Sequence, residues 1–332
     1  MSAGKARILI VGGAGYVGSA AAAWLLDQGH AVHVLDDLST GFRELVLPGA
    51  GFTQGRAGDR ALVGELLARE RFDAVMHFAA RAQAGESVKK PAEYRENNVG
   101  QTTALMETLL PAGVRRVIFS STCAIFGDPG ESDLSEESPK RPLNPYGETK
   151  LEAERTMARL AAERGLQAVA LRYFNAAGAE PGLRVGELHE PETHLIPCVL
   201  RAADAGGELE LFGTDYPTPD GTCVRDYVHV WDLARAHGAA LERLLSRDAG
   251  TGRFEAFNLG SEKGFSVREV IDACGRVVGR PIRVAERPRR AGDPPRLVAD
   301  SGLARRELGF DPKSSTLERI IASAWEWHRR SR

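Results

Sequence analysis

The chain has 332 residues, 43% of them hydrophobic, and its 43 basic and 45 acidic residues give a formal net charge of −2. This length allows a large core and approaches the size at which chains divide into two lobes. The balanced charge does not indicate nucleic acid or a membrane surface as a partner, and no apolar run reaches the length of a membrane span.

The cysteines and the N-terminal residues bear on the compartment. Cys123, Cys198, Cys223 and Cys274 form no CxxC pair and show no zinc spacing. This pattern favours small buried residues in a reducing compartment. The first residues lead into a short apolar strand rather than into the core of a signal peptide. We therefore expect a cytoplasmic protein and no metal ion.

A glycine-rich turn follows the first predicted strand. The aliphatic run 8–11 is typical of a buried parallel strand, and an alanine-rich helix is predicted over 19–28. Between them stand Gly12, Gly15 and Gly18, spaced G-x-x-G-x-x-G rather than G-x-G-x-x-G. Such glycines allow a tight turn, a close backbone approach to a pyrophosphate and close helix–strand packing. Strand, glycine loop and helix together predict a dinucleotide site.

Acidic residues end or follow the next two predicted strands. Asp36 and Asp37 end the strand 31–35, about 20 residues after the glycine loop, where a carboxylate can bind an adenosine ribose. A carboxylate there repels a 2′-phosphate, so NAD is preferred to NADP, although Arg43 lies nearby. Asp36 could instead be a turn residue, and Asp37 fits a loop or a helix cap better. Asp59 either meets the adenine or caps the helix 60–70.

Strands and helices then alternate. The strand 74–78 contains His77, expected to be a core histidine, and ends at Ala79 and Ala80, whose small side chains let a cofactor pass closely. A helix over 94–110 and a strand over 116–120 follow. Ser121 and Thr122 then stand at the carboxyl end of that strand, where open α/β sheets bind ligands. The pattern predicts an α/β fold with a Rossmann-like, doubly wound parallel sheet.

Tyr146 and Lys150 stand four residues apart at the start of a helix predicted over 146–164. This spacing places both side chains on one helical face. A nearby ammonium lowers the pKa of a phenol, which would suit Tyr146 to act as a general acid or base near neutral pH. Taken alone, the pair is more simply a tyrosine on a half-buried face.

The regular alternation weakens near residue 180. We expect a dinucleotide-binding domain over 1–180 and a smaller, mixed α/β substrate lobe over 181–332. Amphipathic helices are predicted there over 231–245 and 267–278. A strand near 255–258 could return to the main sheet.

Together, the glycine loop, Asp36, Thr122 and Tyr-x-x-x-Lys resemble the extended short-chain dehydrogenase/reductase family along nearly the whole chain. Three stretches, 77–87, 172–178 and 211–233, are similar to signature stretches of the UDP-glucose 4-epimerases. The resemblance implies an NAD-dependent isomerase of carbohydrate metabolism that inverts C4 of UDP-glucose or UDP-galactose through a transient 4-keto sugar. It also implies a homodimer whose helices near 91–110 and 146–164 form a four-helix interface.

The resemblance further implies roles for residues at matching positions. The catalytic residues would be Tyr146, Lys150 and Thr122. The residues around NAD would be Gly12, Gly15, Tyr16, Val17, Gly18, Asp36, Asp37, Asp59, Phe78, Ala79, Ala80, Asn97, Ser120, Tyr146, Lys150 and Tyr173. The residues around the UDP-sugar would be Thr122, Asn175, His194, Leu195, Phe212, Arg225, Arg290, Asp293 and Leu297. Two arginines suit a diphosphate, which they grip with paired donors.

The chain also departs from this pattern. Ala82 stands where some members have a lysine, Phe126 replaces a common tyrosine, and His194 replaces an asparagine of some members. Leu297 occupies a position that resembles a gate of the sugar pocket. Leucine there leaves the acceptance of N-acetylated sugars undecided.

Three alternatives stay open. One is a sister epimerase that acts on UDP-N-acetylglucosamine or on UDP-xylose and UDP-arabinose. Another is a sugar-nucleotide 4,6-dehydratase, a family with an Asp-Glu pair where this chain has Cys123 and Ala124. The third is a nucleotide-sensing protein without chemistry, which has no need of Thr122, Tyr146 and Lys150 together.

Overall fold

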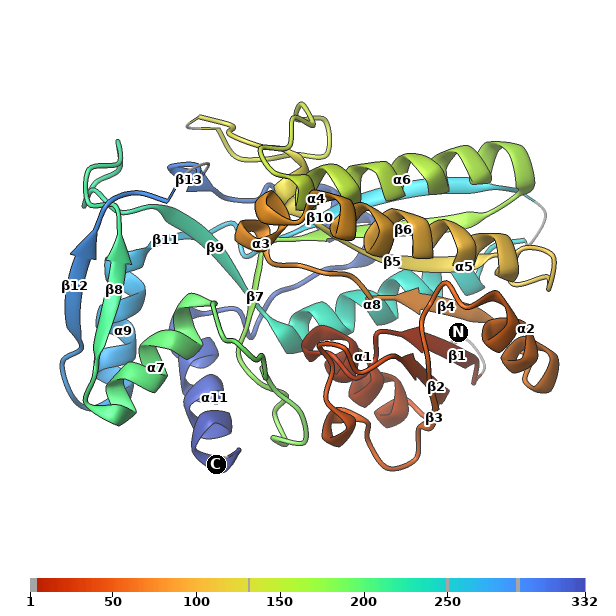
Figure 1. The fold of residues 1–332 in the computed structure, drawn as a ribbon, viewed down its shortest axis with the longest axis horizontal. Coiled ribbons are helices and arrows are strands. Elements are labelled where there is room, and N and C mark those ends of the chain that lie inside the picture. Colours follow the sequence, from red (N-terminus) through yellow and green to blue (C-terminus); the bar gives the residue numbers. More distant parts are fainter. Residues whose placement is uncertain (1–4, 131, 249–250, 291–292, 332) are drawn as a thin grey trace.

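The structure, a computed structural model, describes residues 5–130, 132–248, 251–290 and 293–331. Its centre is a seven-stranded sheet in the order β10-β6-β5-β4-β1-β2-β3 (Figure 1). Every neighbouring pair in this sheet is parallel. The strands are β1 (Arg7–Val11), β2 (Ala31–Asp36), β3 (Gly51–Gln54), β4 (Ala74–His77), β5 (Arg116–Thr122), β6 (Gln167–Tyr173) and β10 (Arg253–Leu259).

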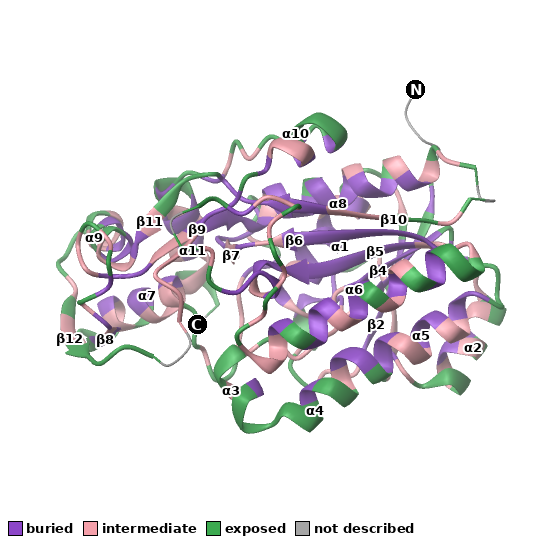
Figure 2. Cartoon of the chain, turned by 90° about the horizontal axis from the view of Figure 1, so that it is seen from above, coloured by how far each residue is buried: buried purple, intermediate pink, exposed green. Residues whose placement is uncertain are grey.

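Helices cover both faces of this sheet. On one face lie α1 (Tyr16–Asp27) and α8 (Val230–Leu245), and on the other lie α2 (Arg60–Arg69), α5 (Gln101–Leu109) and α6 (Pro145–Arg164). Successive strand residues point to opposite faces, so Ile8 packs in the α1–α8 core and Leu9 in the core beneath α5 and α6. Burial on both faces explains the continuous aliphatic runs, and Figure 2 shows the buried strands between the helices. The predicted doubly wound fold is confirmed.

The strand order changes direction at β1. From there the chain moves to β2 and β3 on one side and to β4, β5 and β6 on the other. Such a reversal opens a crevice at the carboxyl ends of the strands, where ligands bind in open α/β sheets. The glycine loop follows β1, and Thr122 ends β5, so both lie at this edge.

A smaller part lies beside the main sheet, at the left of Figure 1. Its β-structure consists of β7 (Asn175–Ala177), β9 (Val224–His229), β11 (Gly264–Ser266) and β13 (Arg296–Leu297), and of the separate pair β8 (Glu208–Phe212) and β12 (Arg283–Arg287). Its helices are α7 (Leu195–Ala205), α9 (Val267–Val278) and α11 (Leu317–Arg330). They share a core of their own, which includes Ile196, Leu211, Val270 and Ile320. The short α10 (Gly302–Leu308) instead contributes to the core around α8.

Two elements differ from expectation. The helix predicted over 94–110 begins earlier, at α4 (Pro91–Arg95), and passes through a π turn (Glu96–Gly100) into α5. Its start is favoured by a proline in the first turn, which needs no intrahelical N–H bond there. A further short helix, α3 (Ala84–Lys89), precedes it.

The helix α8 was expected in the smaller lobe, yet it packs on α1 and on β5 and β6 of the main sheet. Its apolar face, with Leu233 and Leu241, fills the core on that side. The strand β10 does return to the main sheet, beside β6. The division near residue 180 stays a prediction. In the ranges that the structure describes, no helix combines the length and the apolarity that a membrane crossing requires.

Candidate active site

The glycine loop is held against the end of β4. Gly12 has φ +83°, and a Cβ on it would lie 2.3 Å from the backbone nitrogen of Ala79. A Cβ on Gly18 would lie 2.3 Å from the carbonyl oxygen of Gly12. Contacts this short exclude a side chain at either position. Gly12 and Gly18 are therefore required by the fold itself.

Gly15 differs from its neighbours. A Cβ there would meet only the carbonyl oxygen of Gly12, at 3.5 Å. Gly15 is the N-cap of α1, and no side chain caps this helix. The first N–H groups of a helix lack intrahelical partners and attract anions. The space above Gly15 therefore fits the pyrophosphate of a dinucleotide.

The side chain of Asp36 stabilises the glycine loop. One carboxylate oxygen accepts a hydrogen bond from the backbone N–H of Ala14 and the other from that of Leu38, both at 2.9 Å. Burial raises the pKa of Asp36, and these two hydrogen bonds oppose the rise. A carboxylate oxygen can accept more than one hydrogen bond, so both can still receive ribose hydroxyls.

The two acids predicted with Asp36 have local roles. Asp37 accepts a bond from the backbone N–H of Ser39 at 2.9 Å, which is the loop role that we considered. Asp59 caps α2 by accepting from the N–H of Leu62 at 3.1 Å. Capping was one of its two predicted roles. For both residues, a contact with NAD stays a prediction.

Local sequence places Tyr146 at the start of α6. The side chain of Asn144 caps the helix by accepting from the N–H of Gly147 at 2.9 Å, and Pro145 occupies the first turn. A Cβ on Gly147 would lie 2.4 Å from the carbonyl oxygen of Ala124. The helix start is thus pressed against the turn after β5. This packing brings Tyr146 close to Thr122; burial raises the pKa of the phenol, and the hydroxyl of Thr122 opposes this rise.

Lys150 lies one turn further along α6 and is buried. Its ammonium donates to the carbonyl oxygen of Ser120 at 2.9 Å and lies 4.7 Å from the centre of the Phe119 ring. The hydroxyl of Ser120 is hydrogen-bonded to that of Tyr173 on β6. The predicted residues of β5, β6 and α6 therefore meet at the carboxyl edge of the sheet.

One electrostatic expectation is wrong for the chain by itself. We expected Lys150 to lower the pKa of Tyr146, but burial raises that pKa well above its usual value. Burial also lowers the pKa of Lys150 to about 7. The ammonium bonds to a backbone carbonyl rather than to the phenol, so loss of hydration dominates for both groups. The chain alone holds Tyr146 as a neutral phenol, which is a proton donor.

A histidine that the sequence did not reveal stands among the predicted cofactor residues. His237 of α8 lies with its ring 4.7 Å from that of Phe78 and 6.3 Å from that of Tyr173. Its Nδ1 bonds to the carbonyl of Leu233 at 2.8 Å, while its buried Nε2 has no hydrogen-bond partner among the described residues. The only sequence signal was a polar residue on the apolar face of a predicted helix.

Asn97 and Asn98 of the π turn form hydrogen bonds that connect this helix to α6. The amide of Asn98 donates to the hydroxyl of Thr149 on α6 at 3.0 Å and to the carbonyl of Arg81 at 3.0 Å. Asn97 donates to the side-chain oxygen of Asn98 at 3.1 Å. Asn98 thus ties this helix to α6, and Asn97 stays half-buried beside it.

A buried ion pair behind Tyr146 was also missed. Arg172 of β6 binds Glu154 of α6 through two bonds, of 3.0 and 2.6 Å. Ser121 donates to the same carboxylate at 2.5 Å. The side chains of Arg172 and Glu154 are only 6% and 3% exposed, so each charge depends on the other. The pair fixes α6 on β5 and β6.

Several residues predicted around the substrate come together in the smaller part. The guanidinium of Arg290 lies 4.1 Å above the centre of the Phe212 ring, and Arg225 forms an ion pair with Asp293. Leu297 stands opposite Arg225 in the pairing of β13 with β9. Arg225 is engaged by Asp293 in the chain alone, which sequence reasoning did not anticipate.

The remaining residues predicted around the substrate lie in β7 and at the start of α7. Asn175 of β7 stands opposite Tyr227 of β9. His194 is the N-cap residue of α7, and Leu195 is the first residue of that helix. Burial lowers the pKa of His194, but hydrogen bonds to Glu187 and Glu192 outweigh it and raise this pKa to about 10.

Comparisons with known proteins identify the family and the fold. Residues 8–260 match the family described as NAD dependent epimerase/dehydratase family. A UDP-glucose 4-epimerase of Streptomyces lividans is 48% identical over 324 residues, which cover 97% of this chain and 96% of that protein. The solved UDP-glucose 4-epimerase of Brucella ovis in complex with NAD is 48% identical, with a TM-score of 0.91 over 97% of this chain and 98% of that one. The Bifidobacterium longum enzyme in complex with NAD+ and UDP is 34% identical, with a TM-score of 0.91 over 98% of each chain.

Proposed function

Because this chain belongs to the NAD dependent epimerase/dehydratase family, we propose that it is an isomerase that interconverts UDP-glucose and UDP-galactose. One observation carries the proposal: Tyr146 and Thr122 meet beside the buried Lys150, at the sheet edge that also holds the glycine loop. Curated relatives at 45–48% identity over nearly the full chain carry this activity in their names. Galactose metabolism is the corresponding context.

NAD is the cofactor, and the residues present fit it. The open space over Gly15 and the uncapped start of α1 suit its pyrophosphate, and Asp36 suits its adenosine ribose. Lys150, Ser120 and Tyr173 form the hydrogen-bonded group at the nicotinamide end. When bound, NAD would supply a reversible acceptor for the hydride at C4 of the sugar.

The chain itself handles the proton of the sugar 4-hydroxyl. As phenolate, Tyr146 takes this proton when the alcohol is oxidised, and as phenol it returns the proton when the ketone is reduced. Thr122 lies beside the phenol and is placed to relay the proton. Lys150, buried one turn along, supplies a cation that favours phenolate only when it is protonated.

The smaller part holds the UDP moiety. Arg290 over Phe212 offers a planar, exposed cation for a diphosphate, and Arg225 offers a second cation once Asp293 releases it. Tight contacts to UDP and few contacts to the sugar allow the 4-keto sugar to rotate about its bond to the diphosphate. It then presents its opposite face to the cofactor. A 4,6-dehydratase is disfavoured, because the turn after Thr122 carries the buried Cys123 and the half-buried Ala124 where that chemistry needs an acid pair.

The test is turnover without added NAD. The purified chain is incubated with UDP-galactose, and in parallel with UDP-N-acetylgalactosamine and UDP-arabinose, before product analysis. We expect conversion of UDP-galactose to UDP-glucose with no net NADH. Conversion of only the acetylated sugar or only the pentose would move the assignment to a sister epimerase. The absence of any epimer would contradict the proposal.

The glycine loop gives a matched pair of variants. Gly15→Ala is expected to leave the thermal midpoint nearly unchanged, because its Cβ meets only one atom, at 3.5 Å. The methyl group occupies the space of the pyrophosphate, so NAD affinity should fall at least about tenfold, or about 1.4 kcal/mol. Gly18→Ala, with a 2.3 Å contact to a backbone oxygen, should instead lower stability. Calorimetry and NAD titration separate the two effects, and equal losses of stability would contradict this division.

The assembly belongs to the proposal as well. We infer a homodimer in which α5 and α6, adjacent on one side of the molecule (Figure 1), pack against their copies. Small residues on these helices, such as Ala104 and Ala158, are only partly buried in the single chain. Light scattering should give twice the chain mass at micromolar concentration. A monomeric mass would contradict the inference.

We also infer a cytoplasmic location. All four cysteines are free thiols, as is usual in a reducing compartment. Fractionation of cells that produce the tagged chain tests this location.

A further inference from the structure

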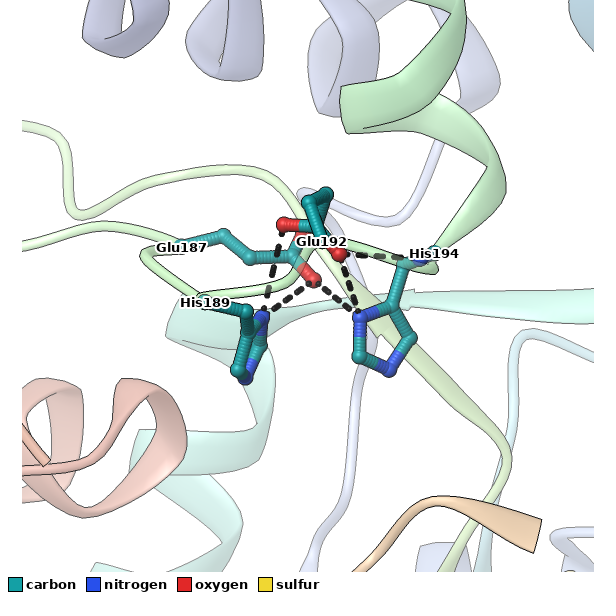
Figure 3. Close-up of side chains that lie close together, drawn as sticks. All are labelled: Glu187, His189, Glu192 and His194. Atoms are coloured by element: carbon teal, nitrogen blue, oxygen red, sulfur yellow. Dashed lines mark hydrogen bonds and ion pairs between the residues drawn. The ribbon is translucent and has the colours of Figure 1, made fainter. Parts of the chain in front are cut away.

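Four side chains of the segment that leads into α7 converge on one point (Figure 3). They are Glu187, His189, Glu192 and His194, and each offers one potential ligand atom within 4.8 Å of all the others. Both histidines turn the same ring nitrogen, Nδ1, toward the two carboxylates. From the spacing of the cysteines we expected no metal ion, but this group contains no cysteine.

The distances between these atoms suit a common central ion. Nδ1 of His189 lies 3.4 Å from Oε1 of Glu187 and 3.5 Å from Oε2 of Glu192. Nδ1 of His194 lies 3.0 Å from Oε1 of Glu187 and 2.9 Å from Oε1 of Glu192. In a tetrahedral site with bonds of about 2.0 Å, ligand atoms stand roughly 3.3 Å apart. The four histidine–glutamate distances thus lie close to this value, and all four ligand atoms lie within 4.8 Å of one another.

The carboxylates of Glu187 and Glu192 differ in their contacts. Oε1 of Glu192 already accepts from the backbone N–H groups of Thr193 and His194, both at 2.8 Å, which holds the side chain in place. Its Oε2 faces His189. Oε1 of Glu187, on a side chain only 6% exposed, lies at ion-pair distance from Nδ1 of both histidines, yet neither contact is aligned as a hydrogen bond. A buried carboxylate needs a compensating positive charge, and a metal ion shared by the four side chains can supply it in place of the protons on the histidines.

We propose that Glu187, His189, Glu192 and His194 bind one divalent transition-metal ion, with zinc as the best match. Imidazole and carboxylate ligands in a four-membered set are a zinc-type donor group, whereas Mg²⁺ and Ca²⁺ prefer oxygen ligands alone. All four ligands come from one short segment, so a single loop can close around the ion. No open position is needed, and the site is structural.

The ion would set the position of a junction between the two parts of the molecule. The ring of Tyr16, in the first turn of α1, meets that of His189 edge-on at 6.2 Å, and its hydroxyl donates to the carbonyl of Gly178 at 2.6 Å. Val185 and Leu188 pack in the same cluster as Tyr16. At the other end, His194 begins α7. A bound ion would therefore fix α7 relative to the glycine loop.

The direct test uses zinc alone on the full chain. Protein is stripped with a chelator, checked for retained helix content and titrated with ZnCl2 against a chromophoric competitor. We expect one zinc per chain and a rise of the thermal midpoint with the first equivalent. Absence of stoichiometric binding to the folded wild-type chain would overturn the proposal, whatever the variants do.

Variants then identify the ligands. His189→Gln and Glu187→Gln should each weaken zinc binding by more than about tenfold, the least that loss of an outer-shell partner usually costs. Glu190→Gln is the matched control, because it removes a carboxylate from the same segment but lies exposed outside the cluster. It should bind zinc like the wild type. Equal affinity in His189→Gln and Glu190→Gln would overturn the assignment.

Cys198 requires a control of its own. Its thiol lies 3.7 Å from the carbonyl oxygen of Glu192, close enough for an unintended zinc contact. Cys198→Ala should retain the single zinc. Loss of zinc in this variant would show a different ligand set and contradict the four-residue site.

Discussion

Tyr146→Phe is expected to reduce the turnover of UDP-galactose by roughly 10²- to 10⁴-fold, the range typical of a lost general acid or base. The substitution removes the phenol hydroxyl that lies beside Thr122 at the start of α6 and leaves the ring in place. The sugar 4-hydroxyl then has no group to take its proton at that position. Initial rates with UDP-galactose, measured on protein of known NAD content, give the comparison.

The control variant for Tyr146→Phe replaces Tyr216, a tyrosine outside the predicted catalytic residues. The hydroxyl of Tyr216 has no hydrogen-bond partner among the described residues, and its ring packs under Arg289 at 4.3 Å. Tyr216→Phe should keep both this packing and the activity. Tyr146→Phe should still retain NAD, because the glycine loop and Asp36 are unchanged. Near-wild-type turnover in Tyr146→Phe would show that the proton is handled by another group.

Glu154→Gln is expected to destabilise the chain by about 3–5 kcal/mol, the usual cost of removing one partner of a buried ion pair. The change leaves the guanidinium of Arg172 buried with no opposite charge in contact, because Glu154 supplies both of its short bonds. Ser121 also loses a charged acceptor. Chemical denaturation at neutral pH measures the change in the free energy of unfolding.

The same helix offers a matched control. Arg159 and Glu163 form an ion pair at 3.0 Å on the surface of α6, with side chains 57% and 55% exposed. Glu163→Gln should cost no more than about 0.5 kcal/mol. The double variant Glu154→Leu with Arg172→Met should regain part of the lost stability, since no charge stays buried. If Glu154→Gln and Glu163→Gln had equal small effects, the buried pair would not anchor α6.

The sequence predicted those parts of the site that depend on a few neighbouring residues. The strand and helix periods around the glycine loop are local, and Gly12 and Gly18 stand where a Cβ would strike the backbone. Asn144 and Pro145 begin α6 through capping and a fixed φ, which are also local effects. The spacing of Tyr146 and Lys150 then places both on one helical face.

The tertiary structure determined the pKa values and the interaction partners of the site residues. The pKa of Tyr146 rises rather than falls, because packing removes water from the phenol while a backbone carbonyl takes the ammonium of Lys150. His237 reaches Phe78, and Arg172 finds Glu154, only through the packing of distant segments. Periodicity shows which face of an element is buried but not its partner. Hydration and pairing depend on that partner, so they follow from the assembled fold.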